Sequence, residues 1–123
     1  MKNINTTMEL MAQGKTISQA LKEVYQTRHV FIPFNEKDME LPIKALNFNA
    51  RSINCFEKIG LKTVLDVINY FNKYEWNSID RFGRGSATDV FEKILDYAWT
   101  KLNTKEQAEF LIKVDEDNEP IEV

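Results

Sequence analysis

Residues that start and stop helices recur at short intervals between Asn49 and Leu102, and the stretches between them carry apolar residues at helical spacing. Asn49 is a strong N-cap residue, and Gly60 suits the position just after a helix end, so a helix of about nine residues is predicted between them. Thr63 is a second candidate N-cap. The sequence therefore predicts a mostly α fold, a compact bundle of short helices. The longest apolar stripe covers about four turns and comprises Ala87, Val90, Phe91, Ile94, Leu95, Ala98 and Leu102.

The same spacing predicts which side of each short helix faces the core, because residues three and four apart share one helix face. In the helix that follows Asn49, the residues predicted to face inward are Ile53, Phe56 and Ile59. In the helix that follows Thr63, they are Val64, Leu65, Ile68 and Phe71.

The first forty residues predict an extension with structure of its own. Thr16 and Gln19 have the spacing of a capping box, which predicts a helix with apolar residues on one face over 17–24. Residues 29–34 are β-branched and aromatic and end at a proline, which predicts a short extended segment or edge strand. We assign residues 1–40 to an N-terminal extension of unknown role.

The end of the chain predicts one more helix and an acidic tail. Thr104 and Gln107 have the spacing of another capping box, and residues 115–123 are rich in carboxylates. The predicted organisation is therefore the extension over 1–40, a helical domain over 41–102, and a C-terminal helix with an acidic tail over 103–123.

Composition excludes several classes of protein. At 123 residues, with 43% hydrophobic residues, the chain is long enough to bury one core. No apolar run approaches the roughly 18–20 residues that cross a bilayer, so we expect no membrane partner. The lone Cys55 has no partner for an internal disulfide, and no export signal opens the sequence, so a cytoplasmic protein is expected. No catalytic triad, metal-ligand cluster or cofactor motif stands out, so we predict a protein that is not an enzyme and needs no cofactor.

The net charge of −3 hides an uneven distribution along the chain. Residues 44–86 carry seven positive and four negative side chains, whereas residues 87–123 carry four positive and ten negative ones. The modestly basic middle contains both of the stretches described next. A polyanion bound there would be held weakly and with marked salt dependence, because few of its charges could be neutralised.

Two stretches in this basic middle are predicted to open directly into helices. The first is Asn49–Cys55, in which Arg51 and Asn54 lie one helical turn apart on the same face. The second is Phe82–Thr88, in which Gly83 and Gly85 permit positive φ and let the turn approach a phosphate closely. Arg84 adds charge, and Ser86 is predicted to cap the following helix or to donate to the phosphate. The alternative for each stretch is an ordinary interhelical turn beside a solvated polar face.

Together, three segments resemble the C-terminal domain of the bacterial RNA polymerase alpha subunit. They are Arg-Ser-Ile-Asn-Cys-Phe at 51–56, Gly-Leu-Lys-Thr-Val-Leu-Asp at 60–66 and Phe-Gly-Arg-Gly-Ser-Ala-Thr-Asp at 82–89. They occur in the family's order and at close to its spacing, over about residues 41–102. The resemblance implies a bundle of about four short helices organised as paired helix-hairpin-helix units.

The resemblance also implies a function, namely binding of the minor groove and flanking phosphates of AT-rich double-stranded DNA as a transcription accessory or regulatory protein. RNA polymerase or a transcription factor is a further partner that it implies. The DNA-binding residues that it implies are Arg51, Asn54, Cys55, Gly83, Gly85, Ser86 and Asp89. Arg84, singled out above for its charge, completes the predicted set of eight.

The sequence departs from the family pattern in three respects. The family's hairpin lysine is Gly85 here, which removes one charged phosphate contact, and the neighbouring Arg84 could compensate for it. The acidic patch that the family uses to meet sigma factor reads Ala45 and Asn47. The polymerase-assembly domain is absent, so we expect a stand-alone relative of the domain.

Two other functions are compatible with the same pattern. Paired helix-hairpin-helix bundles share their outline with SAM-type domains, so a protein–protein interaction module is one alternative. The other is a protein that binds host RNA polymerase or sigma factor without contacting DNA. The joint presence of Arg51, Asn54 and Ser86 favours DNA, because an interaction module needs none of them.

Overall fold

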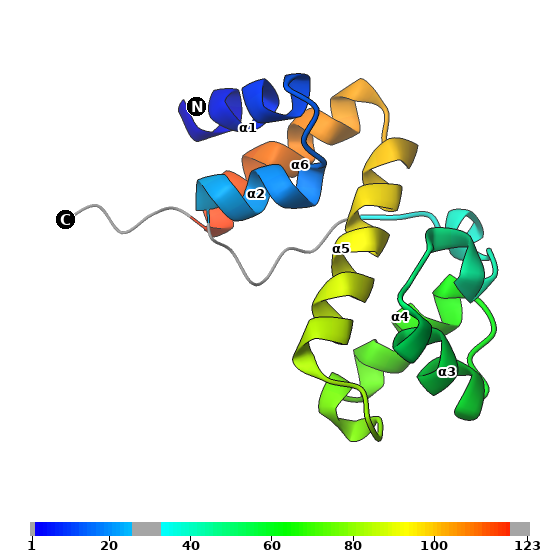
Figure 1. The fold of residues 1–123 in the computed structure, drawn as a ribbon. Coiled ribbons are helices and arrows are strands. Elements are labelled where there is room, and N and C mark those ends of the chain that lie inside the picture. The colour runs from blue at the N-terminus through cyan, green and yellow to red at the C-terminus, as the bar shows by residue number, and fades with distance from the viewer. Residues whose placement is uncertain (1, 26–32, 119–123) are drawn as a thin grey trace. The chain divides into compact units, whose positions relative to one another are not determined.

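The computed structural model describes residues 2–25 and 33–118, and within these ranges the prediction of an all-α fold is confirmed (Figure 1). The described residues form no strand; they contain one isolated antiparallel bridge, between Pro42 and Thr63. Most of the segment predicted as extended, residues 29–34, lies outside the described residues. The helices are α1 (Lys2–Ala12), α2 (Ile17–Tyr25), η1 (Glu36–Met39), η2 (Ile43–Leu46), α3 (Ala50–Lys58), α4 (Val64–Lys73), η3 (Trp76–Ser78), α5 (Arg84–Lys101) and α6 (Thr104–Asp117), where η marks a short 3₁₀ helix.

The chain forms two compact units, one from residues 34–97 and one from residues 1–33 together with 98–123. The first unit contains α3, α4, the three 3₁₀ helices and most of α5. The second contains α1, α2, α6 and the last turn of α5. Each unit is described by itself below.

Both ends of α3 have the caps that the sequence predicts. The Asn49 side chain accepts a hydrogen bond from the backbone N–H of Ser52 at 2.8 Å, so Asn49 is the N-cap. At the other end Gly60 has φ of 82°. Its N–H donates to Glu57 O at 3.2 Å, and the Leu61 N–H donates to Phe56 O at 2.9 Å. This pair of bonds is a Schellman motif, which satisfies carbonyls that the end of the helix leaves free.

The start of α4 is held by a capping box and by the segment that leads into the unit. The Thr63 side chain accepts from the Asp66 N–H, and the Asp66 carboxylate accepts from the Thr63 N–H. Hydrogen bonds from the Lys62 and Thr63 amides lower the pKa of the Asp66 carboxyl, because they stabilise its charged form. The Val64 N–H donates to Leu41 O at 2.8 Å, which fastens the leading segment to this helix start.

An aromatic cluster around Phe56 forms the centre of the residue 34–97 unit. Phe56 is fully buried, and its ring lies 6.0 Å from that of Phe48, 6.2 Å from that of Phe71 and 5.4 Å from that of Phe82. The prediction that Ile59 faces inward is wrong, because Ile59 is the C-cap residue and is 42% exposed. The buried face of α3 consists instead of Ser52, Cys55 and Phe56.

In the other unit, α1 packs against α2 and α6. The capping box predicted at Thr16 and Gln19 is confirmed by its two reciprocal hydrogen bonds, of 3.2 and 3.0 Å. The one predicted at Thr104 and Gln107 is displaced by one residue, since Asn103 caps α6 and pairs with Glu106. Asparagine is the stronger N-cap, so the helix begins one residue earlier than the Thr104 assignment implies.

Two side-chain contacts join helices of this unit. The Tyr25 hydroxyl of α2 donates to the Asp115 carboxylate of α6 at 2.9 Å. Burial and the neighbouring Asp115 charge both raise the pKa of Tyr25, so it remains a hydrogen-bond donor at neutral pH. The rings of Trp99 and Phe110 meet edge to face at 5.9 Å. None of the helices in the described ranges combines the length and the apolar character that a membrane crossing requires.

Candidate nucleic-acid interface

The exposed face of α3 carries two of the predicted DNA-binding residues. Arg51 is the second residue of the helix and Asn54 lies one turn further on, and both side chains are exposed. Among the residues that the structure describes, no carboxylate forms an ion pair with the Arg51 guanidinium. This group therefore remains available to an anionic ligand.

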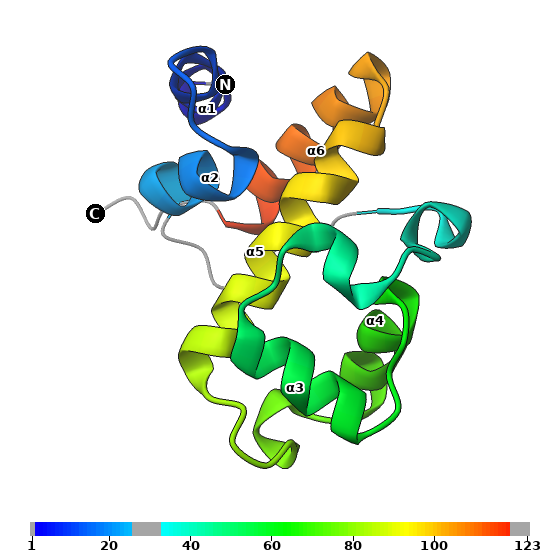
Figure 2. The same ribbon diagram turned by 45° about the vertical axis from the view of Figure 1, so that its right-hand side comes forward.

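Cys55 links α3 to the turn that precedes α5. Its side chain is buried, and its thiol donates to the carbonyl oxygen of Asp80 at an Sγ–O distance of 3.6 Å. The ring of Phe82, two residues after Asp80, packs on Phe56 of α3. Figure 2 shows this turn passing beside α3. The cysteine and the phenylalanine together hold this turn against α3, and Asp80 and Arg81 of the turn line one hollow with Arg51.

The glycines of this turn do not use the positive φ that they permit. Neither Gly83 nor Gly85 has a positive φ, and the left-handed residue is Arg81, with φ of 64°. Gly85 lies within the first turn of α5 and is helical. A Cβ atom added at either glycine would meet no atom of the described residues within 4 Å. The backbone conformation of the turn therefore does not require glycine at these positions. The effect of the two glycines is that no side chain covers the start of α5 there.

The first turn of α5 contains backbone amides that the helix itself does not satisfy. The Ala87 N–H donates to Gly83 O at 3.0 Å, so Gly83 occupies the N-cap position and Arg84 is the first helical residue. The amides of Arg84, Gly85 and Ser86 therefore have no acceptor within the helix. Ser86 is the third residue of the helix and is buried, so it does not cap the helix as predicted.

Asp89 is occupied by contacts within the unit. Its carboxylate accepts a hydrogen bond from the Asn49 N–H at 3.2 Å and forms an ion pair with Lys93 at 2.9 Å. Because Asn49 caps α3 and Asp89 is the sixth residue of α5, these contacts join the start of α3 to the second turn of α5.

An open hollow lies between α3 and the turn before α5. We call it the arginine hollow, and the residues that line it are Arg51, Asn54, Cys55, Glu57, Lys58, Asp80 and Arg81. Three cations face two carboxylates there, and Arg84 adds a fourth cation on the adjoining first turn of α5. Sequence reasoning missed Lys58 and Arg81. Arg81 lies in an irregular turn, where helical spacing does not indicate which side a residue faces.

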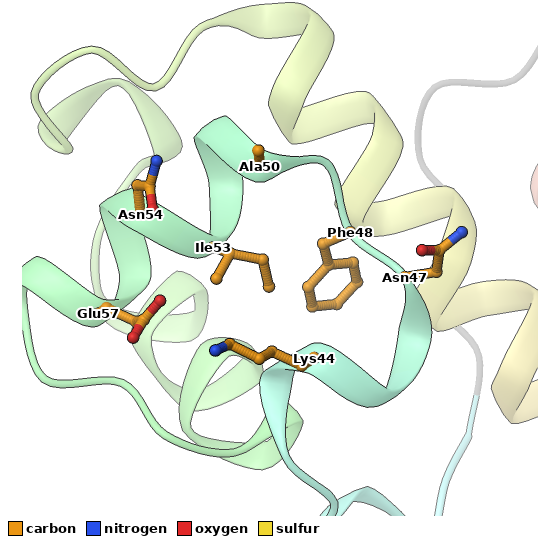
Figure 3. A pocket seen from close by; sticks show the side chains of 7 residues that line it. All are labelled: Lys44, Asn47, Phe48, Ala50, Ile53, Asn54 and Glu57. Atoms are coloured by element: carbon orange, nitrogen blue, oxygen red, sulfur yellow. The ribbon is translucent and has the colours of Figure 1, made fainter.

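A second hollow lies on the other side of α3, and Figure 3 shows the residues that line it. We call it the phenylalanine hollow. The Phe48 ring and Ile53 lie at its centre, and the side chains of Lys44 and Glu57 point toward one another at one end. Asn54 and Glu57 line both hollows, so α3 forms the ridge between them.

The structure thus separates the eight predicted residues by exposure. Arg51, Asn54, Gly83, Arg84 and Gly85 are exposed, whereas Cys55 and Ser86 are buried and Asp89 is partly covered. An exposed polar helix face, a bare helix start and a buried aromatic core thus occur together in one compact all-α unit, as the sequence predicts.

Comparison with known proteins identifies this unit. The sequence profile of one family, described as the C-terminal domain of the alpha subunit of bacterial RNA polymerase, matches residues 33–96. This range almost coincides with the compact unit of residues 34–97. The protein belongs to this family. The resemblance seen in the sequence is therefore confirmed.

The protein is similar to DNA-directed RNA polymerase alpha subunits of several bacteria. The subunit of Tropheryma whipplei (strain Twist) is 29% identical over 91 residues, which cover 74% of this protein and 28% of the relative. That of Helicobacter pylori (strain ATCC 700392 / 26695) is 32% identical over 63 residues, covering 51% and 18% of the two sequences. That of Thermosynechococcus vestitus is 34% identical over 55 residues, covering 45% and 17%. The match thus spans less than a third of each of these relatives. No solved structure matches this protein significantly.

Proposed function

We propose that this protein binds double-stranded DNA through α3 and the first turn of α5, and that it acts as a transcription accessory or regulatory protein. The observation that carries the proposal is the attachment of α3, which exposes Arg51, to the segment that leads into α5 and to α5 itself. The exposed Arg51 lies on α3, and the contacts of Cys55 and Asp89 fasten that helix to the bare start of α5. A cation and a row of free amides are the two groups that hold a nucleic-acid backbone.

The chemistry of α3 favours the minor groove of AT-rich DNA. A-tracts have a narrow minor groove with enhanced negative potential, and an inserted arginine is the side chain that exploits it. The Arg51 guanidinium is exposed at the beginning of a helix, where it can extend away from the unit. Asn54 lies one turn further on and can donate to the base acceptors on the groove floor.

The chemistry of α5 favours a phosphate beside that groove. Three amides without helical acceptors converge at the positive end of an 18-residue helix, and Arg84 adds a full charge to them. The absence of side chains at Gly83 and Gly85 allows close approach to these amides. In this arrangement Cys55 acts by holding the turn against α3.

The charge of the surface predicts modest affinity. The arginine hollow mixes cations with Glu57 and Asp80, so few phosphates can be neutralised and the complex should weaken steeply with salt. A second partner from the transcription machinery would supply additional affinity. The alpha subunits to which this protein is similar belong to DNA-directed RNA polymerase, so the polymerase or a transcription factor is the partner class we propose.

A chemical-shift titration with a short A-tract duplex, at low and moderate salt, tests the proposal. We expect the perturbed amides to cluster at residues 50–55 and 83–89, and Arg51→Ala to abolish most of the shifts. Lys37→Ala is the matched control, because Lys37 is an exposed cation of the same unit that lines neither hollow.

Two results would contradict the proposal. Shifts confined to α1, α2 or α6 would place the interface in the other unit. An absence of shifts combined with self-association would favour the SAM-type interaction module.

A further inference from the structure

We propose that Asp89 and Lys93 act as a clamp that positions Arg51 for DNA without touching the DNA themselves. We define the Asp89–Lys93 clamp as these two side chains with the backbone of Asn47 and Asn49. The inference rests on the proposed function and deepens it, because it assigns a positioning role to each of the two residues. The sequence suggested no role for Lys93, and the resemblance implied direct DNA contact for Asp89.

The clamp is a closed set of contacts between α5 and the loop that leads into α3. The Lys93 ammonium donates to Asn47 O at 2.6 Å and forms the ion pair with Asp89 at 2.9 Å. The same carboxylate accepts from the Asn49 N–H at 3.2 Å. The two charged side chains lie one turn apart on α5, and they engage a loop about 40 residues away in the sequence.

The loop that the clamp holds contains a left-handed residue followed by a buried aromatic one. Asn47 has φ of 58°, in the left-handed region that asparagine adopts more readily than most residues with a side chain. Phe48 anchors the middle of the loop in the aromatic core, and Figure 3 shows Asn47 on the stretch of backbone that passes beside α5. Lys93 and Phe48 therefore fix the loop from two directions.

Fixing this loop fixes Arg51. Asn49 caps α3 through its side chain while its N–H is held by Asp89, so the clamp sets the point at which the helix begins. Arg51 is two residues further along. A minor-groove arginine must enter a narrow slot while the α5 amides contact a phosphate, so both helix starts must keep their relative placement.

The clamp also reconciles Asp89 with a surface for polyanions. A free carboxylate beside the α5 start would repel the phosphates that the amides attract. Here Lys93 neutralises it, and the side chains of the pair are only 33% and 26% exposed for Lys93 and Asp89, respectively. The charge is thus directed inward, against the cation and the Asn49 amide.

Substitution of Lys93 tests the clamp. We expect Lys93→Met to weaken binding of an A-tract duplex about fivefold, a size typical of residues coupled in one hydrogen-bonded network. Lys93→Arg keeps the cation and its reach and should restore most of the affinity. Lys105→Met is the matched control, because Lys105 belongs to another i,i+4 ion pair, with Glu109 in α6.

Two readouts separate positioning from direct contact. If Lys93 acts through Arg51, its substitution should have no further effect in the Arg51→Ala background, and the slope of log K against log salt should not change. If it contacts a phosphate, the two effects should add and the slope should fall by about 0.9. In the absence of DNA, the Asn49 amide proton should shift upfield in Asp89→Ala and more weakly in Lys93→Met.

The binding measurements on these variants distinguish four cases. An effect of Lys93→Met that disappears in the Arg51→Ala background supports the clamp. Additive effects with a reduced slope overturn it in favour of direct contact. Normal binding by Lys93→Met alongside weak binding by Arg51→Ala overturns the clamp and leaves the proposed function intact. A wild-type protein that does not bind DNA overturns both.

Discussion

A lysine introduced at Gly85 should strengthen DNA binding, and the structure allows the size of the effect to be worked out. Gly85 is exposed, has no positive φ, and has no described atom within 4 Å of an added Cβ. Replacing a helical glycine gains up to about 0.7 kcal/mol of stability, whereas a cation at a helix N-terminus costs about 0.3–1 kcal/mol. We therefore expect Gly85→Lys to fold with nearly unchanged stability.

The gain in affinity follows from counterion release. One additional phosphate contact steepens the slope of log K against log salt by about 0.9. If the gain arises entirely from counterion release, the variant should bind about 15-fold more tightly than the wild type at 50 mM salt and about fourfold more tightly at 200 mM. Fluorescence anisotropy with a labelled A-tract duplex across this salt range measures both quantities.

The control adds the same charge elsewhere in the unit. Asn72→Lys lies at an exposed position of α4 that lines neither hollow, so it should leave the slope unchanged. Equal slopes for Gly85→Lys and the wild type, at any affinity, would show that the start of α5 does not contact a phosphate. Equal gains from the two variants would show that net charge, and not the position of the lysine, determines binding.

Two further predictions concern stability. Gly60→Ala should destabilise the protein by about 1–2 kcal/mol, because the φ of 82° at Gly60 disfavours a residue with a Cβ. Gly85→Ala should stabilise the protein by up to about 1 kcal/mol, because alanine has the higher helix propensity. An added Cβ meets open space at both sites, so urea midpoints that move in the same direction for the two variants would refute the argument. Asp66→Asn should lower the melting temperature at pH 7, because the pKa of Asp66 is held below its ordinary value of 3.8 in the folded state. The contribution of the Asp66 carboxylate to stability is fully present above pH 3.8 and is lost as the pH falls through the lower pKa of the folded state. The melting temperatures of the wild type and the variant should therefore converge in acid. A difference in melting temperature that persists in acid would contradict the assigned cause.

The local helix signals were readable from the sequence. Asn49, Thr63 and Thr16 were predicted as N-caps and are N-caps, because capping depends on residues only two or three positions away. Gly60 was placed correctly for the same reason. Helix α1 was not predicted, because its sequence is rich in asparagine and threonine, which are weak helix formers. Its buried Thr7 also breaks the apolar pattern, and the structure shows that the Thr7 hydroxyl donates to Asn3 O within the same helix.

The features that the sequence did not indicate depend on contacts between distant segments. The left-handed residue of the turn is Arg81, although Gly83 and Gly85 are the residues of this turn whose chemistry most readily permits a positive φ. The role of Asp89 depends on Asn49, which lies 40 residues away, and no local pattern indicates that pair. Arg51, Asn54 and the residues of the glycine turn were singled out from the sequence pattern itself, whereas Cys55 and Asp89 came from the family resemblance alone. The contacts of all these residues with DNA remain predictions.

The most direct test of DNA binding by α3 is a measurement of intermolecular nuclear Overhauser effects in the complex with an A-tract duplex. The adenine H2 protons lie on the floor of the minor groove, so they report on any side chain inserted there. We predict contacts from the Arg51 and Asn54 side chains to adenine H2. Contacts from these side chains to thymine methyl groups, which lie in the major groove, or contacts to DNA that come only from α1, α2 or α6, would contradict the account.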